Sequence, residues 1–171
     1  MRGINVGGKN KLPMKNLTEI FADLGCVDVT SYIQSGNIIF KASQELARRV
    51  PDLVAKRIQR SMSLTVPVVV RSATELNEVS RNNPFLEKAG EHGALHVAFL
   101  AERPGSKNIS SLDANRSPPD QFVVRGREIY LSLPNGVAKT KLTNAYFDSK
   151  LATVSTLRNW NTVQKLIELA Q

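Results

Sequence analysis

Apolar residues recur at helical spacing immediately after Pro13. They stand three or four positions apart, which places them on one face of an α-helix. Gly25 follows the last of them and is the residue type that most often ends a helix. The pattern predicts a helix over residues 14–24, whose apolar face holds Met14, Leu17, Ile20, Phe21 and Leu24.

Strand-like runs follow this helix and also stand at both ends of the first 71 residues. Residues 27–33 and 38–40 predict a hairpin across the turn sequence at 35–37. Residues 2–6 predict a first strand. Residues 66–71 predict a last one, where proline suits the start or the edge of a strand.

A basic helix is predicted between the hairpin and the last of these strands. Pro51 would interrupt a helix running from Gln44, so the helix is predicted over residues 51–62, with the proline in its first turn. The elements then follow the order β-α-β-β-α-β of the split βαβ, or ferredoxin-like, unit. The residues predicted to face inward from this helix are Leu53, Val54, Ile58 and Met62.

The second half of the chain repeats this order without an obvious final strand. A short linking helix over residues 73–80, capped by Ser72 or Thr74, precedes it. The fold class predicted is α+β, with two ferredoxin-like (split βαβ) subdomains in tandem, the second less regular. The predicted divisions are 1–72, a linking helix and loop at 73–90, and 91–171. The elements of the second half are strands at 95–100, 120–124 and 128–133, and helices at 107–112, 140–150 and 163–170.

The charge of the chain gives information about its partners. The net charge is +8, and the basic residues gather in three stretches, at 1–18, 48–60 and 149–167. Each stretch alone is typical of a solvated basic face, whereas three in a small protein favour an anionic partner. No run of about 18 apolar residues and no secretory leader is visible, so a cytoplasmic protein that does not enter membranes is expected.

Reactive centres with a recognisable signature are absent from the sequence. His92 and His96 lack companions for a metal site, and Cys26 is predicted to be a small buried hydrophobe. Neither a Walker A loop, a GxGxxG loop nor a GxSxG elbow occurs, and the RNP1 aromatics of RNA-binding sheets are missing. The sequence predicts no metal and no cofactor, and it leaves open whether the protein is an enzyme.

The loop that opens the chain is the strongest candidate for binding. It is basic, free of acidic residues and rich in Gly and Asn, and it leads into the predicted helix. Such a loop is typical of a plain turn, or of a cradle that offers backbone N–H groups and cations to an anion. The glycines would let the backbone approach, the cations would supply charge, and the amides would give directional hydrogen bonds. The candidate ligand-binding residues are Arg2, Asn5, Gly7, Gly8, Lys9, Asn10, Lys11, Gln34 and Asn37, with Arg158 and Asn159 contributed by the second half.

Three segments together resemble one bacterial family, the domain of unknown function 1697. They are residues 2–10 (RGINVGGKN), 32–40 (YIQSGNIIF) and 156–163 (TLRNWNTV). The resemblance implies a two-part ferredoxin-like α+β fold and no established activity, so it assigns no catalytic residues. Family members also carry apolar residues before the first segment. We therefore expect either a shortened first strand here, which would expose a sheet edge, or a natural start upstream of Met1.

These observations support one functional hypothesis and leave two alternatives. The favoured hypothesis is a protein that binds a phosphate-containing small molecule or nucleic acid through the opening loop. The first alternative is an enzyme of unknown reaction that uses the same pocket. The second is a dimeric interaction or structural protein that pairs through its sheet edge, although the sequence predicts no particular oligomeric state.

Overall fold

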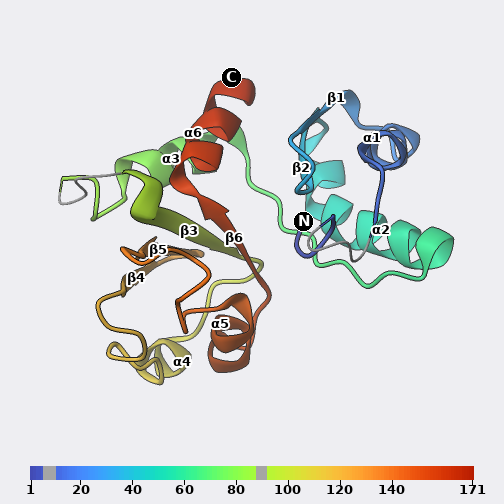
Figure 1. Ribbon diagram of the computed structural model, residues 1–171. Coiled ribbons are helices and arrows are strands. Elements are labelled where there is room, and N and C mark those ends of the chain that lie inside the picture. Colours follow the sequence, from blue (N-terminus) through green and yellow to red (C-terminus); the bar gives the residue numbers. More distant parts are fainter. Residues whose placement is uncertain (6–10, 88–91) are drawn as a thin grey trace. The chain divides into compact units, whose positions relative to one another are not determined.

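The computed structural model describes residues 1–5, 11–87 and 92–171 and shows mixed α and β structure (Figure 1). The chain divides into two compact units. The N-terminal unit comprises Met1–Val70 with Leu169–Gln171, and the C-terminal unit comprises Arg71–Glu168. Each unit has its own sheet.

The N-terminal unit begins with a short irregular segment and the first helix. Helix α1 spans Met14–Asp23, as the apolar spacing predicts, and Gly25 follows its end with φ +91°. The hairpin is also confirmed: β1 (Val27–Tyr32) pairs antiparallel with β2 (Asn37–Lys41) in a two-stranded sheet. The ladder is irregular between Val27 and Thr30, where Asp28 has φ +51°.

The basic helix is longer than predicted. Helix α2 spans Gln44–Met62 and contains Pro51 in its interior, so the prediction that Pro51 stands in the first turn is wrong. The Ser43 hydroxyl accepts the Leu46 N–H and caps a turn that the prediction omitted. The chain tolerates the missing proline N–H because Val50, Val54 and Ile58 bury one stripe on both sides of it.

A single apolar core holds this unit together. It unites fully buried side chains from the opening segment, α1 and α2, including Ile4, Leu17 and Ile58 at 0% exposure. Cys26 belongs to the same core and is 4% exposed, as its predicted role as a small hydrophobe requires. Burial raises the pKa of its thiol.

Neither of the two outer strands predicted for this unit is formed by residues 1–5 or 63–71, the described parts of those segments. Residues 1–5 bend instead of extending, because Gly3 and Asn5 have φ values of +73° and +55°. Residues 63–71 form no strand, although Pro67 O accepts one backbone hydrogen bond from Arg2 N at 3.1 Å. Proline offers no N–H in return, so a continuous ladder cannot run through it. The predicted tandem ferredoxin-like arrangement is therefore not confirmed.

Gly36 at the hairpin turn has no room for a side chain. Its φ is +78°, and a Cβ there would lie 2.7 Å from Cδ1 of Ile4, which is fully buried. Gly36→Ala is expected to lower the free energy of unfolding by about 2–4 kcal/mol, from backbone strain and overpacking together. Gly3→Ala is the matched control, since Gly3 has φ +73° but nothing within 4 Å of its added Cβ. Urea unfolding of both variants measures the difference. Equal losses of unfolding free energy would contradict the claim that the Cβ at position 36 overpacks against Ile4.

The linking helix of the prediction opens the C-terminal unit. Helix α3 spans Ala73–Arg81, and Ser72 caps it in a capping box with Glu75. The Ser72 hydroxyl accepts Glu75 N–H, while the Glu75 carboxylate accepts Ser72 N–H at 2.8 Å. This cap fixes the first turn of α3 and holds one oxygen of Glu75 in place.

A four-stranded antiparallel sheet forms the centre of this unit. Its strand order is β4-β5-β3-β6, with β3 (Leu95–Leu100) between β5 (Glu128–Ser132) and β6 (Ser155–Asn159), and β4 (Gln121–Arg125) at one edge. Figure 1 shows α3 and α6 (Trp160–Leu169) on one side of the sheet, and α4 (Ser106–Ser110) and α5 (Asn144–Leu151) on the other. All six residues of β3 are buried, because both faces are covered.

Strand β6 is the element that the sequence analysis missed. With it, β3 to β6 follow the order β-α-β-β-α-β, so the unit expected to be less regular has the complete split βαβ order. Its core includes Leu100, Ile129, Leu131 and Phe147, each at most 1% exposed. The sheet and its helices provide the rigid base for the pocket described below.

Candidate functional site

Asn5 ties the two ends of the opening loop together. Its side-chain Oδ1 accepts the Leu12 N–H at 2.8 Å, and its Nδ2 donates to Leu12 O, also at 2.8 Å. Asparagine is among the few residues that adopt the left-handed conformation readily, which allows this inward turn at φ +55°. The amide therefore closes the loop between positions 5 and 12 like a backbone pair.

The same side chain connects the loop to the hairpin turn. Asn5 Nδ2 donates to Gln34 O at 3.0 Å, and the Met1 ammonium donates to Gly36 O, also at 3.0 Å. Asn37 is buried and donates to Tyr32 O and to Ser35 Oγ, which fixes the turn. The structure thus brings together Asn5, Lys11, Gln34 and Asn37 of the predicted set, and Arg2 lies in the same segment.

The N-terminus of α1 begins next to this junction. Pro13 supplies no side-chain cap, and the first turn contains no acidic residue. The N–H groups of the first three residues, Met14 to Asn16, have no acceptor within the part of the chain that the structure describes. Lys11 and Lys15 are exposed on either side of the helix start. Free N–H donors and two cations at one point favour a bound anion.

Positive charge is concentrated in this unit. Residues 1–70 carry ten Lys and Arg against five Asp and Glu. Five of the ten lie along α2, where Arg57 pairs with Asp23 at 3.4 Å and Arg49 with Glu45 at 3.9 Å. The remaining α2 cations, Arg48, Lys56 and Arg60, are exposed and add to the field around the unit.

The other predicted residues fall into two groups. Gly7, Gly8, Lys9 and Asn10 lie outside the described residues. Arg158 and Asn159 belong to the C-terminal unit, so their share in a common site stays a prediction. Asn159 Oδ1 accepts the Thr162 N–H at 2.8 Å and caps α6, as its position before that helix suggests.

Arg158 is held against its own strand. Its Nη1 donates to Thr156 Oγ1 and to Leu157 O, both at 2.8 Å. Burial lowers the pKa of Arg158 to about 10, which still leaves the guanidinium charged at neutral pH. A charged guanidinium held in this way can still bind an anion. Its contacts with Thr156 and Leu157 can equally have a purely structural role.

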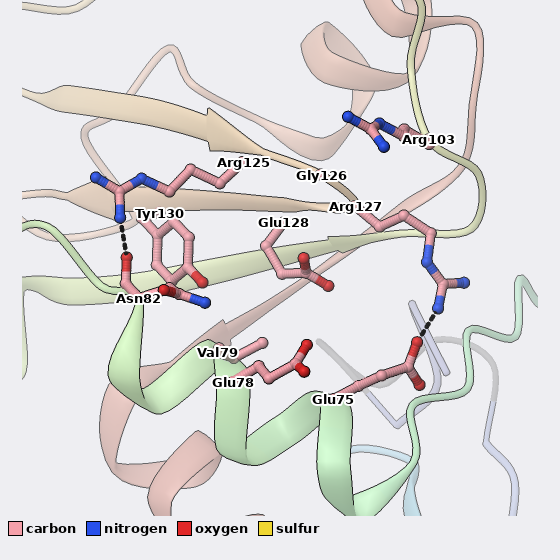
Figure 2. Close-up of a pocket in the computed structure, with 10 residues that line it drawn as sticks. All are labelled: Glu75, Glu78, Val79, Asn82, Arg103, Arg125, Gly126, Arg127, Glu128 and Tyr130. Carbon is pink, nitrogen blue, oxygen red and sulfur yellow. Dashed lines mark hydrogen bonds and ion pairs between the residues drawn. The ribbon is translucent and has the colours of Figure 1, made fainter.

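A pocket that the sequence did not predict lies between α3 and the β4–β5 turn. Its volume is about 530 Å³, and all its lining residues belong to the C-terminal unit (Figure 2). We call it the α3 pocket. Its walls carry both cations and carboxylates. The lining residues are Glu75, Glu78, Val79, Asn82, Arg103, Arg125, Gly126, Arg127, Glu128 and Tyr130.

Two ion pairs involve lining residues of this pocket. Arg71 Nε lies 2.8 Å from Glu128 Oε1, and the Arg71 side chain is only 4% exposed. Nη2 of Arg71 also donates to Leu100 O and Arg127 O, and the guanidinium lies over the Phe99 ring. Arg127 pairs with Glu75 and donates to Ala101 O.

Burial and these partners shift several pKa values. Burial lowers the pKa of Arg71, while Glu128 opposes the shift. Burial alone would raise the pKa of Glu75, but the hydrogen bonds from Ser72 and the charge of Arg127 outweigh it, so that pKa is lowered. Burial, together with the charge of Glu128, raises the pKa of Tyr130 to about 12, so its hydroxyl stays protonated at neutral pH.

The α3 pocket has no local sequence signature. Glu75 and Glu78 share one face of a helix, but Arg127, the partner of Glu75, stands some 50 residues further along the chain. The one available signal is the Arg125-Gly126-Arg127 turn, which the sequence identifies as a hairpin connection. Nothing in the pattern says that α3 would lie beside that turn.

The comparisons with known proteins identify the family. A family model described as a protein of unknown function, DUF1697, matches residues 1–130. The chain belongs to this family, as the three segments indicate. A solved structure, that of a conserved bacterial protein from Streptococcus pneumoniae, is 23% identical with a TM-score of 0.71. The alignment covers 99% of this chain and 95% of that one, and it shows a shared fold. No curated protein matches the chain.

The described helices were compared with the requirements for crossing a membrane. Within residues 1–5, 11–87 and 92–171, none combines the length and the apolar composition that a bilayer crossing requires. The longest helix described, α2, carries five Lys and Arg.

Proposed function

We propose that the N-terminal unit binds a phosphate-containing small molecule or nucleic acid at the opening loop and the start of α1. The observation that carries this proposal is the Asn5 clamp, which joins the loop ends to each other and to the hairpin turn. A loop whose ends are tied together loses less conformational entropy when a ligand orders it. Lys9, Lys11 and Arg2 would supply charge, and Gly7 and Gly8 would permit close approach of the backbone.

The charge distribution supports the same assignment. The N-terminal unit has a net charge of +5, and the free N–H groups of α1 begin beside Lys11. A phosphate there would accept from backbone donors and cations together, the combination found at helix N-termini that bind anions. We add no reaction to this proposal, because the clamp and the cations serve binding alone.

Thermal unfolding with added anions tests the proposal. We expect pyrophosphate, adenosine monophosphate or a short single-stranded RNA to raise Tm by mass action. Lys9→Glu with Lys11→Glu should abolish that rise, whereas Lys107→Glu with Lys139→Glu should preserve it. The second pair produces the same change in net charge on exposed positions of the other unit.

The outcomes separate a formed site from a diffuse field. A rise that persists at high salt and disappears only in the loop variant supports the site. A rise that both double variants lose equally, and that vanishes with salt, contradicts it and assigns the effect to overall charge. The absence of any rise with all three anions also rejects the proposal.

A further inference from the structure

The α3 pocket contains charged groups that the fold does not use. Glu75 and Glu128 already pair with Arg127 and Arg71. The carboxylate of Glu78 and the guanidinium of Arg103 have no hydrogen bond or ion pair to any residue of the described ranges. Arg125 uses only one donor, Nη1, which reaches Asn82 O at 2.8 Å. Unused charges of both signs therefore line one pocket.

Tyr130 adds an unused hydrogen-bond donor to the pocket. The residue as a whole is 2% exposed, and its hydroxyl has no hydrogen-bond partner in the part of the chain that the structure describes. Figure 2 shows the ring reaching from β5 toward α3. The hydroxyl lines the pocket and donates to no described residue, so a ligand there can accept a hydrogen bond from it.

The unused groups divide between two places in the pocket. Figure 2 shows Arg125, Asn82 and the Tyr130 hydroxyl at one end. The carboxylates of Glu78 and Glu128 project into the middle from α3 and β5. The end offers hydrogen-bond donors to a carboxylate, because a guanidinium, an amide and a phenol can all donate. The middle offers acceptors, namely the Glu78 carboxylate and Oε2 of Glu128.

We propose that the α3 pocket binds a small zwitterion of the amino-acid class. Its carboxylate lies at the Arg125 end, and its ammonium lies between Glu78 and Glu128. The volume of about 530 Å³ falls within the range of small-molecule sites, roughly 300–1,000 Å³. A bare anion would meet the two carboxylates, and a bare amine would leave the Arg125 end unmatched. This site is independent of the loop proposed above for phosphate.

Binding of free amino acids to the full chain tests this inference. The common L-amino acids are titrated at millimolar concentration and followed by NMR through the backbone signals of Gly126 and Tyr130. The tightest binder is then compared with its decarboxylated amine and with its deaminated acid. Each of these halves is expected to bind at least about tenfold more weakly, the effect of losing a charge-assisted hydrogen bond.

Variants assign the two charges of the zwitterion to their partners. Arg125→Gln should remove the difference between the amino acid and its amine, and Glu78→Gln should remove the difference between the amino acid and its acid. Both residues are exposed, so the fold should survive, as circular dichroism would verify. Arg81→Gln and Glu87→Gln are matched controls, which are exposed in the same unit but outside the pocket lining.

Each outcome decides the matter. The proposal is supported if binding of the amino acid weakens in the two pocket variants and not in the controls. Arg125→Gln should then bind the amino acid no better than its amine, and Glu78→Gln should bind it no better than its acid. The proposal is overturned if no amino acid moves the Gly126 and Tyr130 signals, or if the halves bind as tightly as the whole. Equal weakening in the control variants would also overturn it.

Discussion

Arg71→Met is expected to lower the free energy of unfolding by about 3–5 kcal/mol, the usual effect of removing one partner of a buried ion pair. The Arg71 side chain is 4% exposed and that of Glu128 is 17% exposed. The substitution would therefore leave the Glu128 carboxylate without its cation at a site with little access to water. The substitution also removes the donors to Leu100 O and Arg127 O, which lie at the end of β3 and at the β4–β5 turn. Urea unfolding followed by circular dichroism measures the loss.

Arg57→Met is the matched control for this ion pair. Arg57 and Asp23 are 56% and 63% exposed, so solvent screens their attraction and the expected loss is about 0–1 kcal/mol. The double variant Arg71→Met with Glu128→Gln should recover part of the stability, because the stranded charge is gone. A loss for Arg71→Met no larger than that for Arg57→Met would show that the buried pair contributes little.

The local part of the fold could be predicted from the sequence because its signals are local. The apolar stripe from Met14 to Phe21 defines α1, and Ser72 with Glu75 marks the start of α3 through a box of four residues. Gly36 indicates a turn because the hairpin needs a positive φ there. In each case the deciding residues lie within one or two turns of one another.

The wrong predictions depend on contacts that are distant in sequence. Pro51 opposes a helix locally, yet α2 runs through it because its buried stripe packs into the core with α1 and the opening segment. β6 looks polar in sequence, since Ser155, Thr156 and Arg158 break any apolar run. It becomes a strand because β3 supplies a ladder from His96 to Leu100. Conversely, 66–71 looks like a strand, but no ladder to another described segment forms along it.

The candidate sites show the same division. Asn5 could be proposed as a polar ligand from its position in a Gly- and Asn-rich loop, but its clamp on Leu12 and Gln34 depends on a turn about 30 residues away. The α3 pocket joins a helix to a hairpin turn about 50 residues further along the chain. No spacing rule for short motifs reaches that distance, so the pocket required the structure.

Trp160→Ala is expected to lower the free energy of unfolding by about 3–5 kcal/mol, as large-to-small substitutions of buried aromatic residues do. Trp160 is 0% exposed and begins α6 directly after β6, so it anchors that helix. Its indole Nε1 is buried and has no partner within the described residues, so the ring acts through packing.

Trp160→Phe separates packing from hydrogen bonding at this position. Phenylalanine keeps most of the apolar volume and removes an N–H that donates to no described residue, so it should cost clearly less than alanine. Val137→Ala is the control, because Val137 is 47% exposed and its loss should stay within about 0.5 kcal/mol. Equal losses for Phe and Ala in urea unfolding would mean that the indole N–H has a partner that matters to the fold.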